Sequence, residues 1–504
     1  MKIKLLLSFL PALSLLLAVF WRPAEAAPTV GVYYYPWYGS FSGGHRWSQS
    51  VRGHLAPPQP PSIGDYSSRD AATIASHIDQ SHKGNIDFWA LSWWGPQSAE
   101  DVTIGNSILG HPRRAELKYA IHYESPGRLG SFDNPNFSNL IPDFRYLANT
   151  YFDNPNYLEI DGRPVVFMYV TRAYFNSQAS RDAVADLRAT MMTEFGVDPY
   201  IVGDDLFSGG VNLQRAQLWD AVTDFDVYGS VMQSKGSTMA ALNQLAALYD
   251  GARNTLAPTD VAFIPTASPG FNDTGVRNGH PAAPRYMTDD PESVEGDLFS
   301  RMMNQVVVPR TDERVDHILM INSFNEWHED TQIEPTIVAP RTNLDDSGTQ
   351  QYTEGHHYEG YGELYLNILR SATVLAGDFD NSGSVDAADY VLWRKSLGQS
   401  GPGFVADGDH NHVVDADDYE IWRANFGRAI EASRNTMKSV SFETVAPEPS
   451  AWLLSAMGFS VVISLREMIS ARGPNGLHFF RQTDALPGYP IITRGRFAGS
   501  RSAR

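Results

Sequence analysis

Short apolar runs alternate with longer amphipathic segments from Thr29 to about Leu375. The runs are almost continuously apolar instead of alternating with polar residues. This pattern is typical of parallel strands that are covered on both faces. The eight runs lie at residues 29–38, 88–95, 117–124, 164–171, 200–205, 221–228, 261–270 and 317–327.

Amphipathic segments of helical length separate several of these runs. The clearest are RDAATIASHIDQ, RDAVADLRATMMTEFG and TMAALNQLAALYDGA. Eight strands separated by helices predict an α/β fold, a (β/α)8 TIM barrel over residues 28–375. A doubly wound open sheet is the alternative, because one sequence does not show whether a sheet closes.

A second pattern follows the predicted barrel, where residues 377–398 match residues 406–427 at a constant offset. Asp378 pairs with Asp407, 29 positions later, and Trp393 pairs with Trp422. A tandem repeat of this length predicts a small all-α module of two copies over residues 377–428, and not a solenoid.

The repeat places oxygen ligands at positions 1, 3, 5, 7, 9 and 12 of an EF-hand-like loop, and position 7 contributes a backbone carbonyl. Such a cage suits a hard cation, so we expect structural Ca²⁺. The alternative is a solvated acidic linker. The predicted ligands are Asp378, Asp380, Ser382, Ser384, Asp386 and Asp389 in the first copy, and Asp407, Asp409, Asn411, Val413, Asp415 and Asp418 in the second.

The two ends of the chain differ in composition from the part between them. Residues 1–26 have a basic start, an apolar stretch and a small-x-small site at Ala24–Ala26, which predicts a cleaved signal peptide and a secreted, periplasmic or cell-surface protein. A membrane anchor is the alternative. After the repeat we predict a linker at 429–445, a short apolar segment at 446–466 and a disordered tail at 467–504.

Charge and cysteine content exclude several classes of function. The 504-residue chain has a formal net charge of −19, which argues against a nucleic-acid partner. It has no cysteine, so disulfides, thiol catalysis and Cys-based zinc sites are excluded. Neither a G-x-S-x-G elbow nor a Walker motif is present, and His328-Glu329 lacks the second His of a zinc protease. We therefore expect no cofactor for catalysis.

The stretch SFNEWHEDTQIEP at 323–335 follows the last predicted strand and carries two acids three positions apart, Glu326 and Glu329. In a parallel barrel the carboxyl ends of the strands form the active-site face. If these residues continue as a helical turn, both side chains lie on one face. Two carboxyls in one partly dry cleft cannot ionise equally easily, and an acid paired with a carboxylate is what acetal hydrolysis requires. The alternative is two solvated loop acids.

Other strand ends carry groups that suit a sugar, namely aromatic rings for stacking and polar groups for its hydroxyls. For any single aromatic residue, packing in the core is the alternative. The predicted substrate-binding residues are Tyr33, Tyr35, Trp37, Trp93, Trp94, His122, Glu124, Tyr169, Arg172, Asn325, Trp327 and His328.

The segments VYYYPWYG, ALSWWGP, HYES, DGRPVVFMYVTRAY and FNEWHEDTQIEP resemble glycoside hydrolase family 99, over most of residues 29–370. This family contains endo-α-mannosidases, endo-α-1,2-mannanases and looser family-99-like domains. The resemblance implies a retaining (β/α)8 hydrolase that acts on oligo- or polysaccharides rich in α-mannose. The 2-hydroxyl of the substrate would be the nucleophile and a 1,2-anhydro sugar the intermediate.

The same resemblance implies roles for particular residues. Glu326 would assist deprotonation of the 2-hydroxyl, and Glu329 would protonate the leaving oxygen and then activate water. Glu124 and the tyrosines of the first strand resemble sugar-contacting positions. One departure is Asp330, where the family usually has Gly; an extra acid there is expected to alter the pKa of Glu329.

Two further resemblances concern the C-terminal part of the chain. The repeat resembles a type I dockerin, which implies a cohesin-type partner; His412 stands where Gly383 provides the turn in the first copy. The segment APEPSAWLLSAMGFSVVISLR resembles a PEP-type sorting signal and implies transient membrane association. Its apolar run is shorter than the ~20 residues that a membrane-spanning helix needs.

Two alternatives to a mannan hydrolase stay open at this point. The first is a non-catalytic carbohydrate-binding or surface scaffold protein, assembled through the dockerin-like module. The second is an enzyme of the looser family-99-like group that acts on a different α-glycan.

Overall fold

The computed structural model describes residues 27–45, 47–380, 382–400, 404–408 and 413–428. The chain divides into two compact units at Asn435, and all the described residues lie in the first. The predicted signal peptide, linker, sorting segment and tail lie outside the described residues. Within the described part, the helices are too short or too polar to span a membrane.

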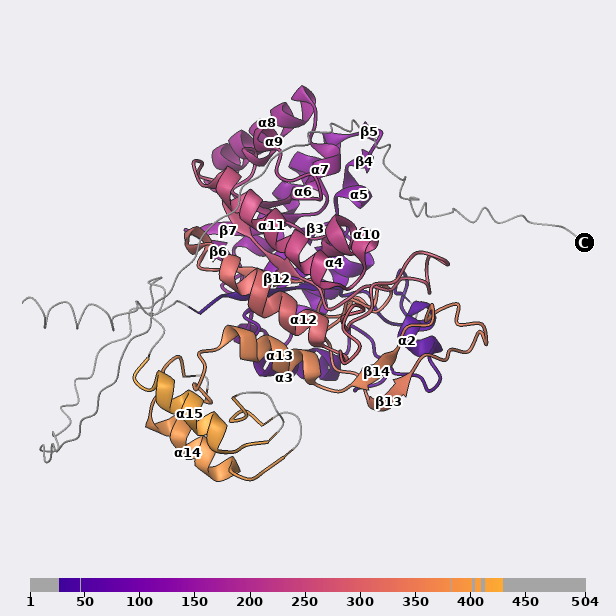
Figure 1. Cartoon of the computed structure of the whole chain (residues 1–504). Coiled ribbons are helices and arrows are strands. Elements are labelled where there is room, and N and C mark those ends of the chain that lie inside the picture. The colour runs from indigo at the N-terminus through magenta and orange to yellow at the C-terminus, as the bar shows by residue number, and fades with distance from the viewer. Residues whose placement is uncertain (1–26, 46, 381, 401–403, 409–412, 429–504) are drawn as a thin grey trace, which may run out of the picture. The chain divides into compact units, whose positions relative to one another are not determined.

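Nine parallel strands form the central sheet of the domain before the repeat, in the order β10-β9-β8-β7-β3-β2-β1-β12-β11 (Figure 1). All eight predicted apolar runs contribute to it. Its strands are β1 (Val30–Tyr34), β2 (Phe88–Trp93), β3 (Lys118–Tyr123), β7 (Arg163–Met168), β8 (Tyr200–Asp204), β9 (Ala221–Thr223), β10 (Ala262–Ile264), β11 (Thr266–Ala267) and β12 (Leu319–Ile321).

The two ends of this sheet meet in one segment of the chain. Strands β10 and β11 are consecutive and are separated only by Pro265. β10 pairs with β9 on one side, whereas β11 pairs with β12 on the other. The sheet is therefore a nearly closed parallel barrel, consistent with the predicted TIM barrel, and the open-sheet alternative is wrong.

Helices connect the strands, and the three predicted amphipathic segments form α3, α8 and α11. Helix α8 begins with a capping box between Ser177 and Ser180 and ends at Gly196, whose φ of 67° is accessible to glycine without strain. The longer helices are α3 (Ala71–Lys83), α4 (Ala99–Thr103), α6 (Leu140–Leu147), α8 (Gln178–Phe195), α11 (Met239–Leu256), α12 (Asp297–Met302) and α13 (Leu364–Thr373).

Short elements fill the connections between these helices and strands. Further helical turns at Ile104–Ile108, Ala148–Phe152 and Met303–Val307 continue α4, α6 and α12. The short helices and strands are α2 (Val51–His54), α5 (Ser125–Arg128), α7 (Thr171–Tyr174), α9 (Leu213–Ala216), α10 (Gln233–Lys235), β4 (Gly130–Ser131), β5 (Asn134–Pro135), β6 (Glu159–Ile160), β13 (Val338–Thr342) and β14 (Tyr358–Tyr361).

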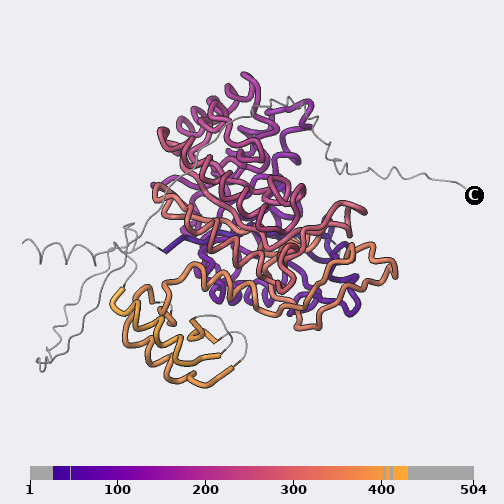
Figure 2. The backbone as a smooth tube through the Cα atoms, in the orientation of Figure 1, coloured from indigo at the N-terminus to yellow at the C-terminus, as the bar shows by residue number. Residues whose placement is uncertain are grey.

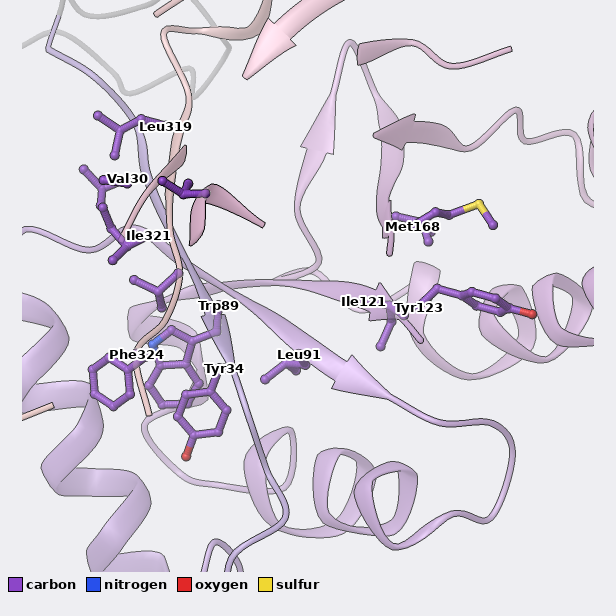
Figure 3. Packing of buried hydrophobic residues seen from close by; sticks show 14 of the residues in the cluster. Val30, Tyr34, Trp89, Leu91, Ile121, Tyr123, Met168, Leu319, Ile321 and Phe324 are labelled. Atoms are coloured by element: carbon purple, nitrogen blue, oxygen red, sulfur yellow. The ribbon is translucent and has the colours of Figure 1, made fainter. Parts of the chain in front are cut away.

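The barrel strands separate two buried layers because successive side chains point to opposite faces. In β1, Val30, Val32 and Tyr34 pack outward against the helices, whereas Tyr33 and Tyr35 belong to the inner cluster. Figure 3 shows part of the outer layer, where Tyr34 stacks on Trp89 with ring centroids 4.3 Å apart. This alternation decides which strand-end residues face the interior.

The hairpin of β13 and β14 lies beside an early part of the chain. Leu55 forms a bridge with Asp345, and Pro61 forms one with Thr336. Figure 2 shows these segments, one indigo and the other orange, side by side. The hairpin thus brings the region around α2 next to the loop that follows β12.

The repeated segment forms two helices, α14 (Ala387–Ser396) and α15 (Ala416–Asn425), around a small core that includes Phe379 and Trp393. The repeats are linked reciprocally. The indole N–H of Trp393 donates to the carbonyl of Asp415 at 2.7 Å, and that of Trp422 donates to the carbonyl of Asp386 at 2.7 Å. The two copies therefore fold as one unit.

Candidate active site

The two predicted catalytic acids lie in a tight loop after β12. The loop closes because Ser323 N–H donates to the Thr331 carbonyl at 2.8 Å and Thr331 N–H donates to the Glu326 carbonyl at 3.2 Å. Residues 327–330 form one hydrogen-bonded turn and not a longer helix, so the expectation that both acids share one face of the turn stays a prediction. Asp330 closes the turn with a φ of 49°, a left-handed conformation in which a right-handed helix does not continue.

Glu326 is buried and its carboxylate receives two local donors. His328 N–H donates to Glu326 Oε1 at 2.9 Å, and the Tyr38 hydroxyl also hydrogen-bonds with the carboxylate. Burial and the charge of Glu329 raise the pKa of Glu326, whereas these donors favour its ionised form. The two carboxyls are thus close enough to influence each other's ionisation.

Glu329 reaches solvent, with 28% of its side chain exposed. Burial raises its pKa to about 7, and the charge of Arg277, whose Nη2 lies 3.9 Å from Glu329 Oε1, acts in the opposite direction. Asp273 holds Arg277 through a 2.5 Å contact and also raises the pKa of Glu329. Near neutral pH, Glu329 is therefore able both to give and to take a proton.

A third carboxyl, Glu124 at the end of β3, belongs to the same group. Burial raises its pKa to about 8, and the Ser92 hydroxyl donates to Glu124 Oε1 at 2.7 Å. Tyr35 marks the centre of the group, because burial and then the charges of Glu124, Glu326 and Glu329 all raise its pKa. The structure thus brings together predicted residues from β1, β3 and the loop after β12.

His122 is a buried polar side chain inside the barrel. Its side chain is 1% exposed, and neither ring nitrogen has a hydrogen-bond partner among the described residues. Burial lowers its pKa to about 3, so the ring is neutral. Tyr33 lies against it at 4.7 Å between ring centroids and Phe225 at 5.3 Å. An unsatisfied buried imidazole is a candidate partner for a ligand hydroxyl.

Aromatic rings from two loops stack beside Glu326. Trp37 stacks on His45 with centroids 4.4 Å apart and an interplanar angle of 1°, and His328 lies 5.4 Å from His45. His328 Nδ1 lies 3.5 Å from Glu326 Oε1. His328 therefore lies beside Glu326, and Trp37 lies next to His328, with ring centroids 6.2 Å apart. Their predicted sugar contacts stay predictions.

Tyr169 and Arg172 follow β7, and acidic groups bind Arg172. Arg172 binds Asp204 at 2.6 Å and Asp226 at 3.2 Å. Between them, Val170 adopts a φ of 48°, which is rare for a β-branched residue, and its N–H donates to Asp204 at 2.9 Å. Burial, and then the charges of Asp226 and Glu329, raise the pKa of Tyr169.

Trp93 is a correction to the predicted set. Its ring lies in the outer layer, and its N–H donates to Asp101 Oδ1 on α4 at 2.8 Å. The neighbouring Trp94 packs against the inner cluster, and its N–H donates to the Ser92 hydroxyl at 3.1 Å. The physical reason is the two-residue period of a strand, which sends only one of two adjacent side chains inward.

Asn325 and Trp327 contact protein groups in the structure. Asn325 binds the backbone of Tyr35 twice, accepting from its N–H at 2.7 Å and donating to its carbonyl at 3.1 Å. Trp327 N–H donates to the Tyr38 hydroxyl at 2.9 Å. These contacts fix the loop of Glu326 and Glu329 against the end of β1, and the predicted sugar contacts of both residues stay predictions.

Glu334 is a residue beside the candidate site that the sequence analysis did not single out. This buried carboxylate accepts hydrogen bonds from the Tyr66 hydroxyl at 2.8 Å and from the Trp327 indole at 2.8 Å, and it lies 3.1 Å from His77 Nε2. Its place in the TQIEP stretch was the available signal. No sequence signal pointed to Arg277 and Asp273, because they lie some fifty residues before the two acids.

The predicted cation site is partly within the described residues. Asp378, Asp380 and Asp389 each direct one carboxylate oxygen into a group within 4.8 Å, which fits the donor set of a hard cation. Ser382, Ser384, Asp386, Asp407, Val413, Asp415 and Asp418 are also described, whereas Asp409 and Asn411 lie outside the described residues. The Ca²⁺ prediction for the module stays open.

Known proteins resemble this chain over the barrel. The mouse protein named glycoprotein endo-alpha-1,2-mannosidase is 24% identical over 346 residues, covering 62% of this chain and 68% of that protein. The human glycoprotein endo-alpha-1,2-mannosidase-like protein is 24% identical over 344 residues, covering 60% and 68%. A structure of the GH99 endo-alpha-mannosidase from Bacteroides thetaiotaomicron aligns with a TM-score of 0.48 at 20% identity, over 69% of this chain and 97% of that one.

The sequence profile of the family described as Glycosyl hydrolase family 99 matches residues 55–365, which is more than half of the chain. The match includes the loop with Glu326 and Glu329, as well as Glu124 and Arg172. It begins after β1. This protein belongs to glycoside hydrolase family 99 and is a glycoside hydrolase.

Proposed function

We propose that the protein is an exported, retaining, endo-acting hydrolase that cleaves internal α-mannosidic bonds, with α-1,2 bonds as the preferred linkage. Its relatives named endo-alpha-1,2-mannosidase supply the substrate class. The observation that carries the proposal is the pair Glu326 and Glu329, which share one turn at the carboxyl end of β12 and both have raised pKa values.

In the first step, the carboxylate of Glu326 takes the proton from the 2-hydroxyl of the sugar. The 2-oxygen then attacks the anomeric carbon, and the bond from that carbon to the leaving oxygen breaks. Glu329, as the carboxylic acid, gives its proton to the leaving oxygen. The products are a 1,2-anhydro sugar and a glycan with a free hydroxyl, and no protein atom bonds to the sugar.

In the second step, water attacks the anomeric carbon and opens the three-membered ring. The Glu329 carboxylate takes a proton from the water, and Glu326 returns its proton to the 2-oxygen. Two inversions at one carbon give net retention. The exposure of Glu329 supports its role with water, and the donors around Glu326 support its role as the base.

Product analysis tests this proposal. The full chain is incubated with α-1,2-mannan and with a panel of other α-mannans and α-glucans, and early products are followed by NMR. We expect internal cleavage of the mannan and release of the α-anomer first. Release of the β-anomer would contradict retention, and cleavage of an α-glucan alone would place the enzyme in the looser family-99-like group.

The pH dependence of the reaction provides a prediction about Arg277. Because Glu329 has a pKa of about 7, kcat/KM is expected to fall above that pH as the acid loses its proton. Arg277→Met removes a nearby positive charge that favours the carboxylate, so the fall should move to higher pH. Solvent screening limits the shift to about one pH unit or less.

The control for this prediction is Arg301→Met, which removes a guanidinium of similar exposure that binds Asp290 at 2.8 Å. It should leave the pH profile unchanged. A shift of the Arg277→Met profile to lower pH would show that the guanidinium does not act on Glu329 in this way.

The parts outside the barrel belong to the same proposal. We infer that residues 1–26 direct export, that the repeat binds structural Ca²⁺ and docks to a cohesin-type protein, and that residues 446–466 mediate sorting at a membrane. The carboxylate group of Asp378, Asp380 and Asp389 supports the ion. No catalytic step uses the ion.

Calcium removal provides a further prediction. Calorimetry on the full chain should detect Ca²⁺ binding, and Asp389→Asn should weaken it because one charged ligand is lost. At 100 times its Kd, the ion would stabilise the module by about 2.7 kcal/mol. Asp417→Asn, which changes an exposed acid outside the predicted ligand set, is the control. Equal Ca²⁺ binding by both variants would contradict the predicted cage.

A further inference from the structure

The residue after the catalytic acid, Asp330, is buried and bound on several sides. Its side chain is 2% exposed, although its backbone has the positive φ described above. Arg52 Nε donates to Asp330 Oδ1 at 2.6 Å, and Arg285 Nε donates to Oδ2 at 3.2 Å. Arg285 Nη2 also donates to the Asp330 backbone carbonyl at 2.8 Å. Both the side chain and the backbone of this turn are therefore held.

These residues belong to a buried ion cluster, which we define as Arg52, Arg285, Glu295 and Asp330. Arg52 Nη2 lies 3.1 Å from Glu295 Oε1, and the Tyr365 hydroxyl donates to the same oxygen at 3.0 Å. Two guanidinium groups face two carboxylates. Burial alone would raise the pKa of Asp330, but the charges of Arg285 and Arg52 outweigh it and hold the pKa below its usual value.

The buried ion cluster connects segments that are far apart in sequence. Arg52 lies on α2, and Arg285 and Glu295 lie between β11 and α12. The ring of Tyr361, from β14, packs 4.8 Å from the guanidinium of Arg52 and 5.2 Å from that of Arg285. The turn at Glu329 is thus attached to three other parts of the barrel face.

Asp330 is not among the charges that most affect the pKa of Glu329, although the sequence led us to expect an effect. The charges of Arg277, Asp273 and Asp226 act on Glu329, and the carboxyl of Glu326 is close enough to influence its ionisation as well. Asp330 is instead paired with two cations, so its charge is compensated within the buried ion cluster. Its effect on Glu329 is therefore one of position.

We propose that Asp330 is a positioning residue for Glu329, and that the buried ion cluster holds the turn so that the Glu329 carboxyl stays against the leaving oxygen. Asn272 N–H donates to the Glu329 carbonyl at 2.7 Å and so holds the neighbouring peptide of the same turn. The reaction it serves is the proposed function above. A displacement of about 1 Å at a catalytic group lowers turnover by about 10²-fold.

The test compares two substrates that differ in their need for an acid. In a glycosyl fluoride of the same sugar, the fluoride ion leaves without being protonated. In the natural disaccharide linkage, the leaving oxygen must be protonated by an acid. For Asp330→Asn, kcat/KM should fall about 10- to 100-fold on the disaccharide linkage and less than about threefold on the fluoride. Asp330→Gly should give the same pattern on the two substrates. Because glycine accepts the positive φ without strain, this variant keeps the test valid if Asp330→Asn folds poorly.

The matched control is Asp312→Asn. Asp312 is a buried aspartate that binds Arg314 at 2.6 Å and accepts from Phe263 N–H at 3.1 Å, before β12 and away from the catalytic loop. It should lower the melting temperature and leave kcat/KM unchanged on both substrates. If Asp330→Asn likewise lowers only the melting temperature, or reduces both substrates equally, Asp330 has a structural role alone and the proposal is overturned.

Hydrogen exchange separates this proposal from the proposed function. Peptides that cover residues 323–336 should exchange faster in Asp330→Asn than in the wild type or in Asp312→Asn. A wild-type protein that cleaves neither substrate would contradict the proposed function, but hydrogen exchange would still test whether Asp330 holds the turn. Unchanged exchange of residues 323–336 in Asp330→Asn would overturn the positioning role.

Discussion

Glu329→Gln is expected to lower kcat/KM on an α-mannan by about 10²- to 10⁴-fold, the usual contribution of a general acid and base. Glutamine has nearly the same shape, but it cannot give a proton to the leaving oxygen or take one from water. Steady-state kinetics on the mannan and on a glycosyl fluoride measure the effect. Part of the loss should be recovered on the fluoride, because fluoride leaves without a proton.

The control for this variant is Glu313→Gln, which changes an exposed carboxylate before β12. Circular dichroism should show that both variants keep the wild-type fold. If Glu329→Gln kept more than about a tenth of wild-type kcat/KM on the mannan, its role as the acid would be excluded.

Glu326→Gln is expected to give a loss of similar size, about 10²- to 10⁴-fold, for a different reason. Without the carboxylate, the 2-hydroxyl is not deprotonated and the nucleophile is not formed. A better leaving group does not correct this, so kcat/KM should stay low on the glycosyl fluoride as well. The pattern across the two substrates therefore distinguishes the base from the acid.

Two observations would contradict the role of Glu326. One is recovery of the Glu326→Gln variant on the fluoride, which would make it a second acid. The other is a covalent sugar adduct on the protein, detected by mass spectrometry, because substrate participation forms none. A substrate without the 2-hydroxyl should also resist the wild-type enzyme.

The strands and the large helices could be predicted well from the sequence. Runs such as PVVFMYV at 164–170 are apolar throughout because both faces of a parallel strand are covered, and this property is local. Helix α8 carries its own start and stop signals at Ser177 and Gly196. Closure of the barrel was not predictable in the same way, since it depends on the pairing of β11 with β12 across about fifty residues.

The active-site residues were predicted less evenly. Glu326, Glu329 and Glu124 lie together in the structure, because the carboxyl ends of parallel strands meet on one face. Trp93 and Trp94 are adjacent and chemically identical, yet only Trp94 packs inward. The position at which each strand leaves the barrel decides this, and the composition of the segment does not contain that information.

By itself, the sequence determined the apolar runs, the repeated spacing of oxygen ligands and the presence of two acids three positions apart, because each is a property of neighbouring residues. Only the tertiary structure decided which side chains meet. Asp330 pairs with Arg52, 278 positions away, and with Arg285, 45 positions away. Long-range charge pairing of this kind depends on how the barrel folds. The sequence therefore presented Asp330 as an extra acid in the active site, whereas the structure places it in the buried ion cluster behind the turn.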